Sequence, residues 1–147
     1  MSLAALYTTE FVMLRDTDTV RTAMTQMLQH RVTDLPVVDG GGKLLGMFAL
    51  DSVLASILPK AALLGHGLPD LNFVNPTIEA LRAHMHNVEH ESVCNYISQE
   101  QTVGVDSSPL EVVLLLYRGA RSVPVVSGSK LVGMITTRDL LSALHGT

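Results

Sequence analysis

The sequence predicts an α/β fold of the α+β kind, in which one unit of strand, helix, strand, strand and helix occurs twice within 147 residues. The first observation is a repeat: Leu35-Pro36-Val37-Val38 returns as Val123-Pro124-Val125-Val126, 88 positions later (124 − 36 = 88). The second is an apolar Gly-Met strand after each copy, at Gly46 and at Gly133. The third is helical spacing of apolar residues on both sides of each strand pair. A repeat this long indicates a duplicated structural unit rather than a solenoid period.

The first unit is assigned to residues 8–59. Its five elements are predicted, in chain order, at 11–14, 20–30, 35–38, 44–49 and 51–58. Asp16–Thr19 supplies side chains that favour the start of the first helix. Pro36 predicts either that its strand lies at a sheet edge or that the proline stands at the start of the strand, because proline has no N–H to donate. Asp51 is expected to cap the closing helix, which Pro59 ends.

Residues 60–92 have no counterpart in either copy of the unit. They are predicted to form an irregular connection and then a helix with Pro76 at its first position, ending near His90. A bracing helix, a dimerisation element and a lid all remain open as roles for this insertion. The second unit, residues 93–147, repeats the five elements at 103–105, 110–117, 123–126, 131–135 and 137–144.

Composition excludes several classes of protein. A net charge of −4 argues against sequence-independent nucleic-acid binding, which requires a basic face. The single cysteine, Cys94, forms no internal disulfide and fits a reducing cytoplasm. The most apolar window, 44–58, is too short to span a membrane. A hydrophobic content of 47% with a mean hydropathy of +0.31 predicts that some surface is buried against a partner.

The repeated Pro-Val-Val strands, the repeated Gly-Met strands and the run Gly133-x-Ile-Thr-x-x-Asp139 resemble the CBS domain, named for cystathionine beta-synthase. Two such units in tandem resemble a Bateman module. The resemblance implies that the units pack sheet to sheet about a pseudo-twofold axis and leave two clefts for adenosine-containing ligands. It also implies a regulatory module without catalysis or a required cofactor, which forms a flat homodimer and acts on an unknown effector protein.

The resemblance further implies which residues bind the ligand. In the family the signature aspartate, here Asp139, accepts hydrogen bonds from ribose hydroxyls, and Thr136 lies near the phosphates. A carboxylate can accept two hydroxyl donors, and a helix N-terminus favours an anion. Thr136-x-x-Asp139 is also a capping box that needs no ligand, and both roles can coexist. The expected ligand-binding residues are Thr136, Asp139, Arg138, Val123, Pro124 and Arg121.

The first copy of the signature is incomplete. Ala49 stands where Thr136 does, and Ser52 stands where Asp139 does. Asp51 lies one residue early and is therefore interpreted as a cap rather than a ribose acceptor. The sequence thus predicts one competent cleft, in the second unit, for AMP, ADP, ATP, S-adenosylmethionine or NAD, and one degraded or differently used cleft.

Three other interpretations are a metal site, an enzyme and an interaction module. His86 and His90 are four residues apart, a spacing that can hold a metal ion on one helix face, but a solvated helix explains them as well. No Gly-x-Ser-x-Gly, Walker or dinucleotide motif occurs, so no enzyme is predicted. The alternative function is a structural or protein-interaction module whose clefts are closed by side chains.

Overall fold

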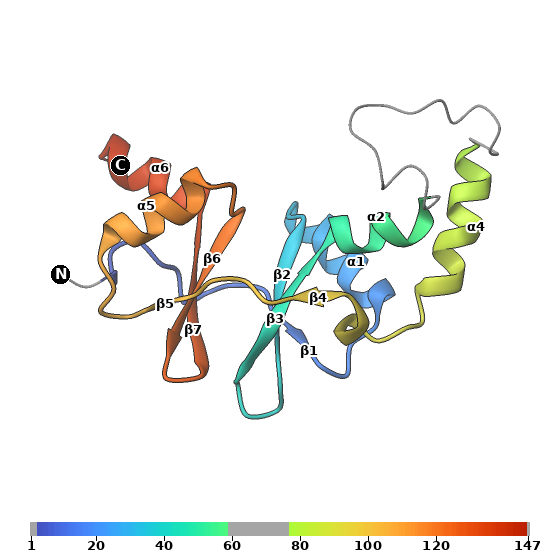
Figure 1. Ribbon diagram of the computed structural model, residues 1–147, viewed down its shortest axis with the longest axis horizontal. Coiled ribbons are helices and arrows are strands. Elements are labelled where there is room, and N and C mark those ends of the chain that lie inside the picture. The colour runs from blue at the N-terminus through green and yellow to red at the C-terminus, as the bar shows by residue number, and fades with distance from the viewer. Residues whose placement is uncertain (1–2, 59–76, 147) are drawn as a thin grey trace.

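The structure is a computed structural model that describes residues 3–58 and 77–146. The first unit contains β1 (Leu14–Arg15), α1 (Val20–His30), β2 (Asp34–Val38), β3 (Leu44–Ala49) and α2 (Leu50–Ile57). The insertion contributes α4 (Ile78–Val88), and the start of the second unit contributes a 3-10 helix (Val93–Tyr96) and β4 (Ile97–Ser98). The second unit contains β5 (Val103–Gly104), α5 (Pro109–Tyr117), β6 (Ser122–Ser127), β7 (Lys130–Thr136) and α6 (Thr137–His145). The two units lie side by side, as Figure 1 shows.

Most predicted helices and strands are confirmed, and the boundaries of α1 and β3 match those predicted. Thr19 caps α1 by accepting a hydrogen bond from the N–H of Thr22. The insertion helix α4 instead begins at Ile78, because Thr77 is its N-cap, so the predicted start at Pro76 is wrong. Pro59, Pro76 and the predicted irregular connection lie outside the described residues.

The two sheets have the orders β1-β2-β3-β4 and β5-β6-β7. β2 therefore lies inside its sheet, and Pro36 is its third residue, so both positions predicted from Pro36, an edge strand and the start of a strand, are wrong. β1 pairs only with Val37 and Val38, however, so Pro36 faces a neighbouring strand on one side only, at Met47 of β3. The proline is tolerated because the second neighbour does not reach it. The strand predicted at 11–14 is observed only as Leu14–Arg15, because its parallel pairing with β2 is two residues long.

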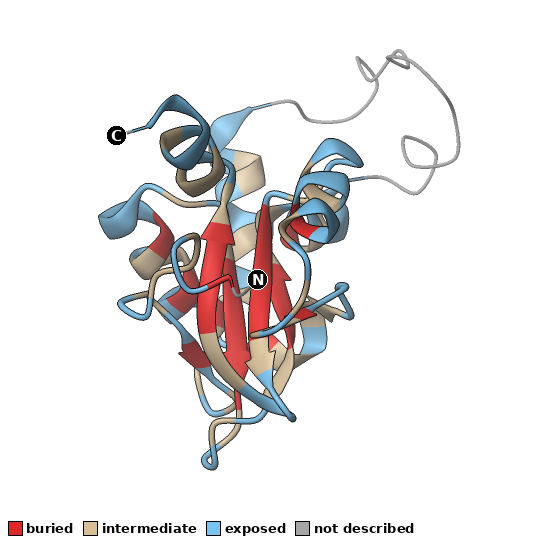
Figure 2. Ribbon diagram, turned by 90° about the vertical axis from the view of Figure 1, so that its left-hand side faces the viewer, coloured by how far each residue is buried: buried red, intermediate tan, exposed pale blue. Residues whose placement is uncertain are grey.

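Each sheet carries its own hydrophobic core. Figure 2 shows that the buried residues are concentrated in the strands, with exposed helices around them. The core of the first unit includes Phe48 and Val53, and Met85 and Val88 of α4 pack against it. These contacts place α4 against the first unit.

The N-terminal segment packs on the second unit rather than the first. Leu3 is fully buried in the core of the second unit, and Thr8 exchanges backbone hydrogen bonds of 3.1 and 3.2 Å with Met134 of β7. In return β4, which precedes β5 at the start of the second unit, pairs with β3 of the first. Each unit is thus completed by the segment that leads into the strands and helices of the other unit.

This exchange explains the repeated glycines. A Cβ atom on Gly133 would lie 2.2 Å from Cδ2 of Tyr7. A Cβ atom on Gly46 would lie 2.8 Å from the carbonyl oxygen of Ser98. Both positions require glycine because a segment of the other unit, at Tyr7 or at Ser98, approaches the strand closely.

Candidate functional site: the clefts between the two units

Equivalent residues of the two units meet at their interface. The hydroxyl of Ser122 donates to Oδ2 of Asp34 at 2.8 Å, and these residues are 88 positions apart, the offset of the repeat. Asp34 pairs with Ala49 across β2 and β3, and Ser122 pairs with Thr136 across β6 and β7. The strand-to-helix junction of each unit therefore lies beside this contact, one on either side.

The contact also perturbs Asp34. Burial raises the pKa of this carboxyl above its ordinary value, and the hydrogen bond from Ser122 and the charge of Arg121 oppose the rise. Glu100 and Asp51 add to it as nearby negative charges. Asp34 is thus a half-buried acid at the centre of the interface, with its side chain held by the other unit.

The junction of the second unit forms the predicted capping box. Thr136 Oγ1 accepts a hydrogen bond from the N–H of Asp139 at 3.2 Å. Oδ2 of Asp139 accepts from the N–H of Thr136 at 2.8 Å and from its hydroxyl at 3.0 Å. This oxygen is engaged in starting α6, so a ribose hydroxyl would bind the other carboxylate oxygen or replace a capping bond. Arg138, the second residue of α6, is exposed.

The junction of the first unit has the same backbone positions without the same groups. Ala49 is the N-cap of α2 and Ser52 its third residue, as Thr136 and Asp139 are for α6, and no side chain caps α2. The predicted cap at Asp51 is therefore wrong, because this residue is the second residue of α2 and lies two positions past the N-cap. Its carboxylate pairs instead with Arg121 of the second unit.

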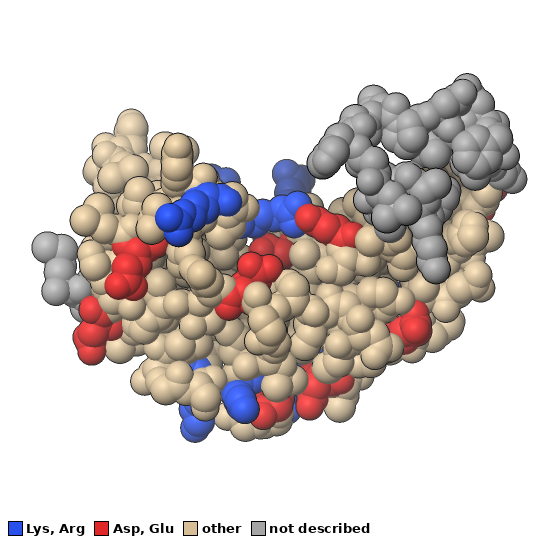
Figure 3. All heavy atoms as spheres, in the orientation of Figure 1, with Lys and Arg blue, Asp and Glu red and all other residues tan. Residues whose placement is uncertain are grey.

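A cavity of about 230 Å³ lies against the junction of the first unit. Its walls include Ala49, Asp51 and Ser52 from the first unit, and Gly119, Arg121 and Ser122 from the second. Two contacts join the Arg121 guanidinium to the Asp51 carboxylate: Nη1 to Oδ1 at 2.6 Å and Nη2 to Oδ2 at 2.9 Å. The hydrogen bond and charge of Arg121 lower the pKa of Asp51. In Figure 3 basic and acidic side chains meet in the hollow between the two units.

The structure divides the predicted site residues between two places. Thr136 and Asp139 form the junction of the second unit, whereas Arg121 lines the cavity of the first. Val123 and Pro124 are buried in β6, with Val123 in the core of the second unit. Neither the bridge from Ser122 to Asp34 nor the ion pair of Arg121 was predicted. The hydrogen bond between Ser122 and Asp34 could have been found from the offset of 88 residues in the repeat, because residues at this offset are equivalent and can meet on the pseudo-twofold axis.

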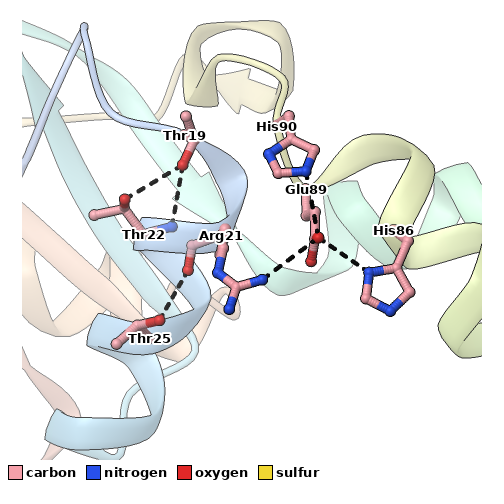
Figure 4. A network of polar contacts seen from close by, with 7 residues as sticks. All are labelled: Thr19, Arg21, Thr22, Thr25, His86, Glu89 and His90. Atoms are coloured by element: carbon pink, nitrogen blue, oxygen red, sulfur yellow. Dashed lines mark hydrogen bonds and ion pairs between the residues drawn. The ribbon is translucent and has the colours of Figure 1, made fainter.

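The histidines of the insertion surround a carboxylate. Oε1 of Glu89 lies 3.0 Å from Nδ1 of His86, 3.5 Å from Nε2 of His90 and 3.5 Å from Nη1 of Arg21 in α1 (Figure 4). The prediction that His86 and His90 share one helix face is wrong, because α4 ends at Val88. Over residues 3–58 and 77–146, no three His, Cys, Asp or Glu side chains are placed to hold a metal ion together. The cluster joins α4 to the start of α1.

Comparison with known proteins identifies the family. The family model of the CBS domain matches residues 3–59 and 92–146, which include both strand-to-helix junctions. The chain belongs to the CBS domain family. This family assignment covers both units and leaves out most of the insertion. A search of curated protein sequences gave no match.

Solved structures share the fold of this chain. A CBS domain-containing protein of unknown function from Kribbella flavida has a TM-score of 0.73 at 20% identity, with 99% of each chain covered. CBSX2, solved in complex with AMP, has a TM-score of 0.71 at 19% identity, with 99% of this chain and 96% of CBSX2 covered. Protein MJ1004 from Mathanocaldococcus jannaschii has a TM-score of 0.71 at 17% identity. The alignment covers 99% of this chain and 60% of that longer protein. In the described part of this CBS chain, no helix has the length and apolar character needed to cross a membrane.

Proposed function

We propose that this CBS chain is a regulatory module that binds an adenosine-containing ligand in the cleft of the second unit. The observation that carries the proposal is the junction of Thr136 and Asp139, which lies beside the contact between the units. CBSX2, a protein of the same fold, was solved with AMP. A ligand at this junction would lie next to the hydrogen bond that joins Ser122 of the second unit to Asp34 of the first.

The proposed roles follow from the chemistry of each group. Asp139 accepts hydrogen bonds from the ribose hydroxyls, because an ionised carboxylate makes the stronger hydrogen bonds. Thr136 and the start of α6 lie on the phosphate side, where the helix dipole favours an anion. Arg138 adds a positive charge at the exposed second position of α6. The first unit lacks the threonine and the aspartate, so the chain has one principal ligand site, in the second unit. Binding at this site requires no catalytic group.

Thermal unfolding with a ligand panel tests the proposal. The panel is AMP, ADP, ATP, S-adenosylmethionine and NAD, with GMP as the control for the base. A ligand at about one hundred times its Kd stabilises the folded chain by roughly 2.7 kcal/mol. Asp139→Ala should abolish the shift measured against its own ligand-free midpoint, and Ser52→Ala at the equivalent position of the first unit should retain it. No shift with any adenosine ligand would leave the interaction module as the better account.

We propose that the module acts as a homodimer that pairs through its second unit. α5 and α6 lie next to each other in the second unit (Figure 1). Their exposed apolar side chains are Leu110, Val113, Leu114, Tyr117, Leu141 and Leu144. The corresponding helix of the first unit, α1, exposes mainly polar residues such as Arg21, Thr22 and Thr25. An apolar face of this extent is typical of an interaction surface.

Regulation then requires that the ligand distinguish two arrangements of the units. A ligand shifts such an equilibrium only by its difference in affinity for the two arrangements. The bridge between Asp34 and Ser122 and the ion pair between Asp51 and Arg121 are contacts that would differ between them. An effector protein would respond to this change.

A further inference from the structure

The ion pair between Asp51 and Arg121 crosses the cavity beside the first unit. Asp51 belongs to the first turn of α2, and Arg121 belongs to the segment that leads into β6. The two contacts of 2.6 and 2.9 Å form a bidentate pair between the units. Both side chains line the cavity, so a ligand that enters it meets the pair directly.

Arg121 is the one basic side chain among the described residues that line this cavity. The carboxylates of Asp34 and Glu100 line it as well. The hydrogen bond to Asp51 and its charge raise the pKa of Arg121, and the charges of Asp34 and Glu100 add to the rise. An anionic group that enters the cavity thus has a single cationic partner. The guanidinium fork matches a phosphate as well as it matches a carboxylate, so a phosphate and Asp51 would use the same donors.

The strength of the ion pair decides whether a ligand can replace it. The side chains of Arg121 and Asp51 remain 47% and 63% exposed, respectively. Pairs this exposed are weak because water and salt screen them. A phosphate that brings two negative charges can displace the carboxylate, but it binds less tightly than it would to an unoccupied guanidinium.

We propose that Asp51 is an intramolecular competitor for Arg121, which lowers the affinity of the first cleft for phosphate-bearing adenosine ligands. Such a ligand binds there by separating a contact between the two units, whereas an adenosine without phosphate leaves the contact in place. This inference rests on the proposed function, because it takes adenosine ligands as the class that the clefts accept. The first cleft, which lacks the aspartate of the signature, would then distinguish ligands by their phosphate.

The test is a site-resolved NMR titration of the full chain with AMP and with adenosine. The amide resonances of Ser52 and Gly119, which line the first cleft, report affinity there. Asp51→Asn should bind AMP roughly two- to fivefold more tightly, the fold-change that corresponds to an exposed ion pair, with adenosine unchanged. Arg121→Gln should remove the difference between AMP and adenosine. Glu111→Gln, which removes one charge from the first turn of α5, is the matched control and should keep the wild-type affinities.

The outcomes separate this inference from the proposed function. Unchanged or weaker AMP binding by Asp51→Asn at the first cleft refutes the competitor role and leaves the proposed function intact. If the amide of Asp139 shifts with AMP while those of Ser52 and Gly119 do not, the first cleft takes no such ligand and the inference alone is wrong. If none of these resonances shifts with either ligand, both proposals are refuted.

Discussion

The close contact between Gly133 and Tyr7 predicts that Gly133→Ala destabilises the fold. The added Cβ would lie 2.2 Å from Cδ2 of the ring and 2.9 Å from Cγ and Cε2, so the ring must move by about 1 Å or more to reach an ordinary contact. The ring is not free to do so, because Thr8 is hydrogen-bonded to Met134 and Leu3 is buried. Overpacking of this kind costs about 1–3 kcal/mol, which lowers the Tm by roughly 3–10 °C for a chain of this size.

Chemical denaturation of a double-mutant cycle measures this contact. Tyr7→Ala removes the ring, so Gly133→Ala should cost at least about 1 kcal/mol less in that background. Gly104→Ala is the matched control, because its Cβ would come no closer than 3.7 Å to the hydroxyl of Ser107. Equal losses from Gly133→Ala with and without the ring would refute the docking of the N-terminal segment on β7.

Three further predictions concern the exposed face of α5, the half-buried acid Asp34 and the missing cap of α2. Leu114→Glu on the exposed face of α5 should give a monomer by light scattering, and an unchanged mass would contradict pairing through that face. Because burial raises the pKa of Asp34, its ionised form opposes folding; Asp34→Asn should therefore be more stable than wild type near neutral pH. In urea titrations, the difference in unfolding free energy between Asp34→Asn and wild type should shrink as the pH falls through the pKa of folded Asp34 towards 3.8, the ordinary value for an aspartate. A difference that does not change with pH would contradict a raised pKa for Asp34. Ala49→Thr with Ser52→Asp should build a capping box on α2 worth about 1 kcal/mol, and circular dichroism melting without a gain would count against it.

The duplication made most of the fold predictable from sequence. Local signals were sufficient for α1, β3 and the capping box of Thr136 and Asp139, because each depends on residues within one or two turns. The repeat placed the two units in order and equated Ala49 with Thr136. The position of Pro36 was mispredicted because the number of neighbouring strands is a property of the assembled sheet.

Contacts between distant segments were not predictable in this way. The docking of Tyr7 on Gly133 joins residues from opposite ends of the chain, and no local pattern encodes it. The helix α5 is apolar on most of its surface, so periodicity could not show that Leu110 and Tyr117 face outwards while Val112 is buried. The partner of Arg121 was equally hidden, because an exposed arginine can reach several carboxylates and only the docking of the units selects Asp51.

Calorimetric titration of AMP into the wild-type chain and Asp139→Asn tests the central claim most directly. The substitution keeps the size of the side chain and removes the charge that would bind the ribose hydroxyls. The account predicts saturable binding to wild type and roughly 10- to 100-fold weaker binding to the variant, the loss expected for charge-assisted hydrogen bonds. Ser52→Ala should bind as wild type does. Equal affinity of wild type and Asp139→Asn, or no binding of AMP or any other adenosine ligand to wild type, would contradict the assignment of the ligand site to the second unit.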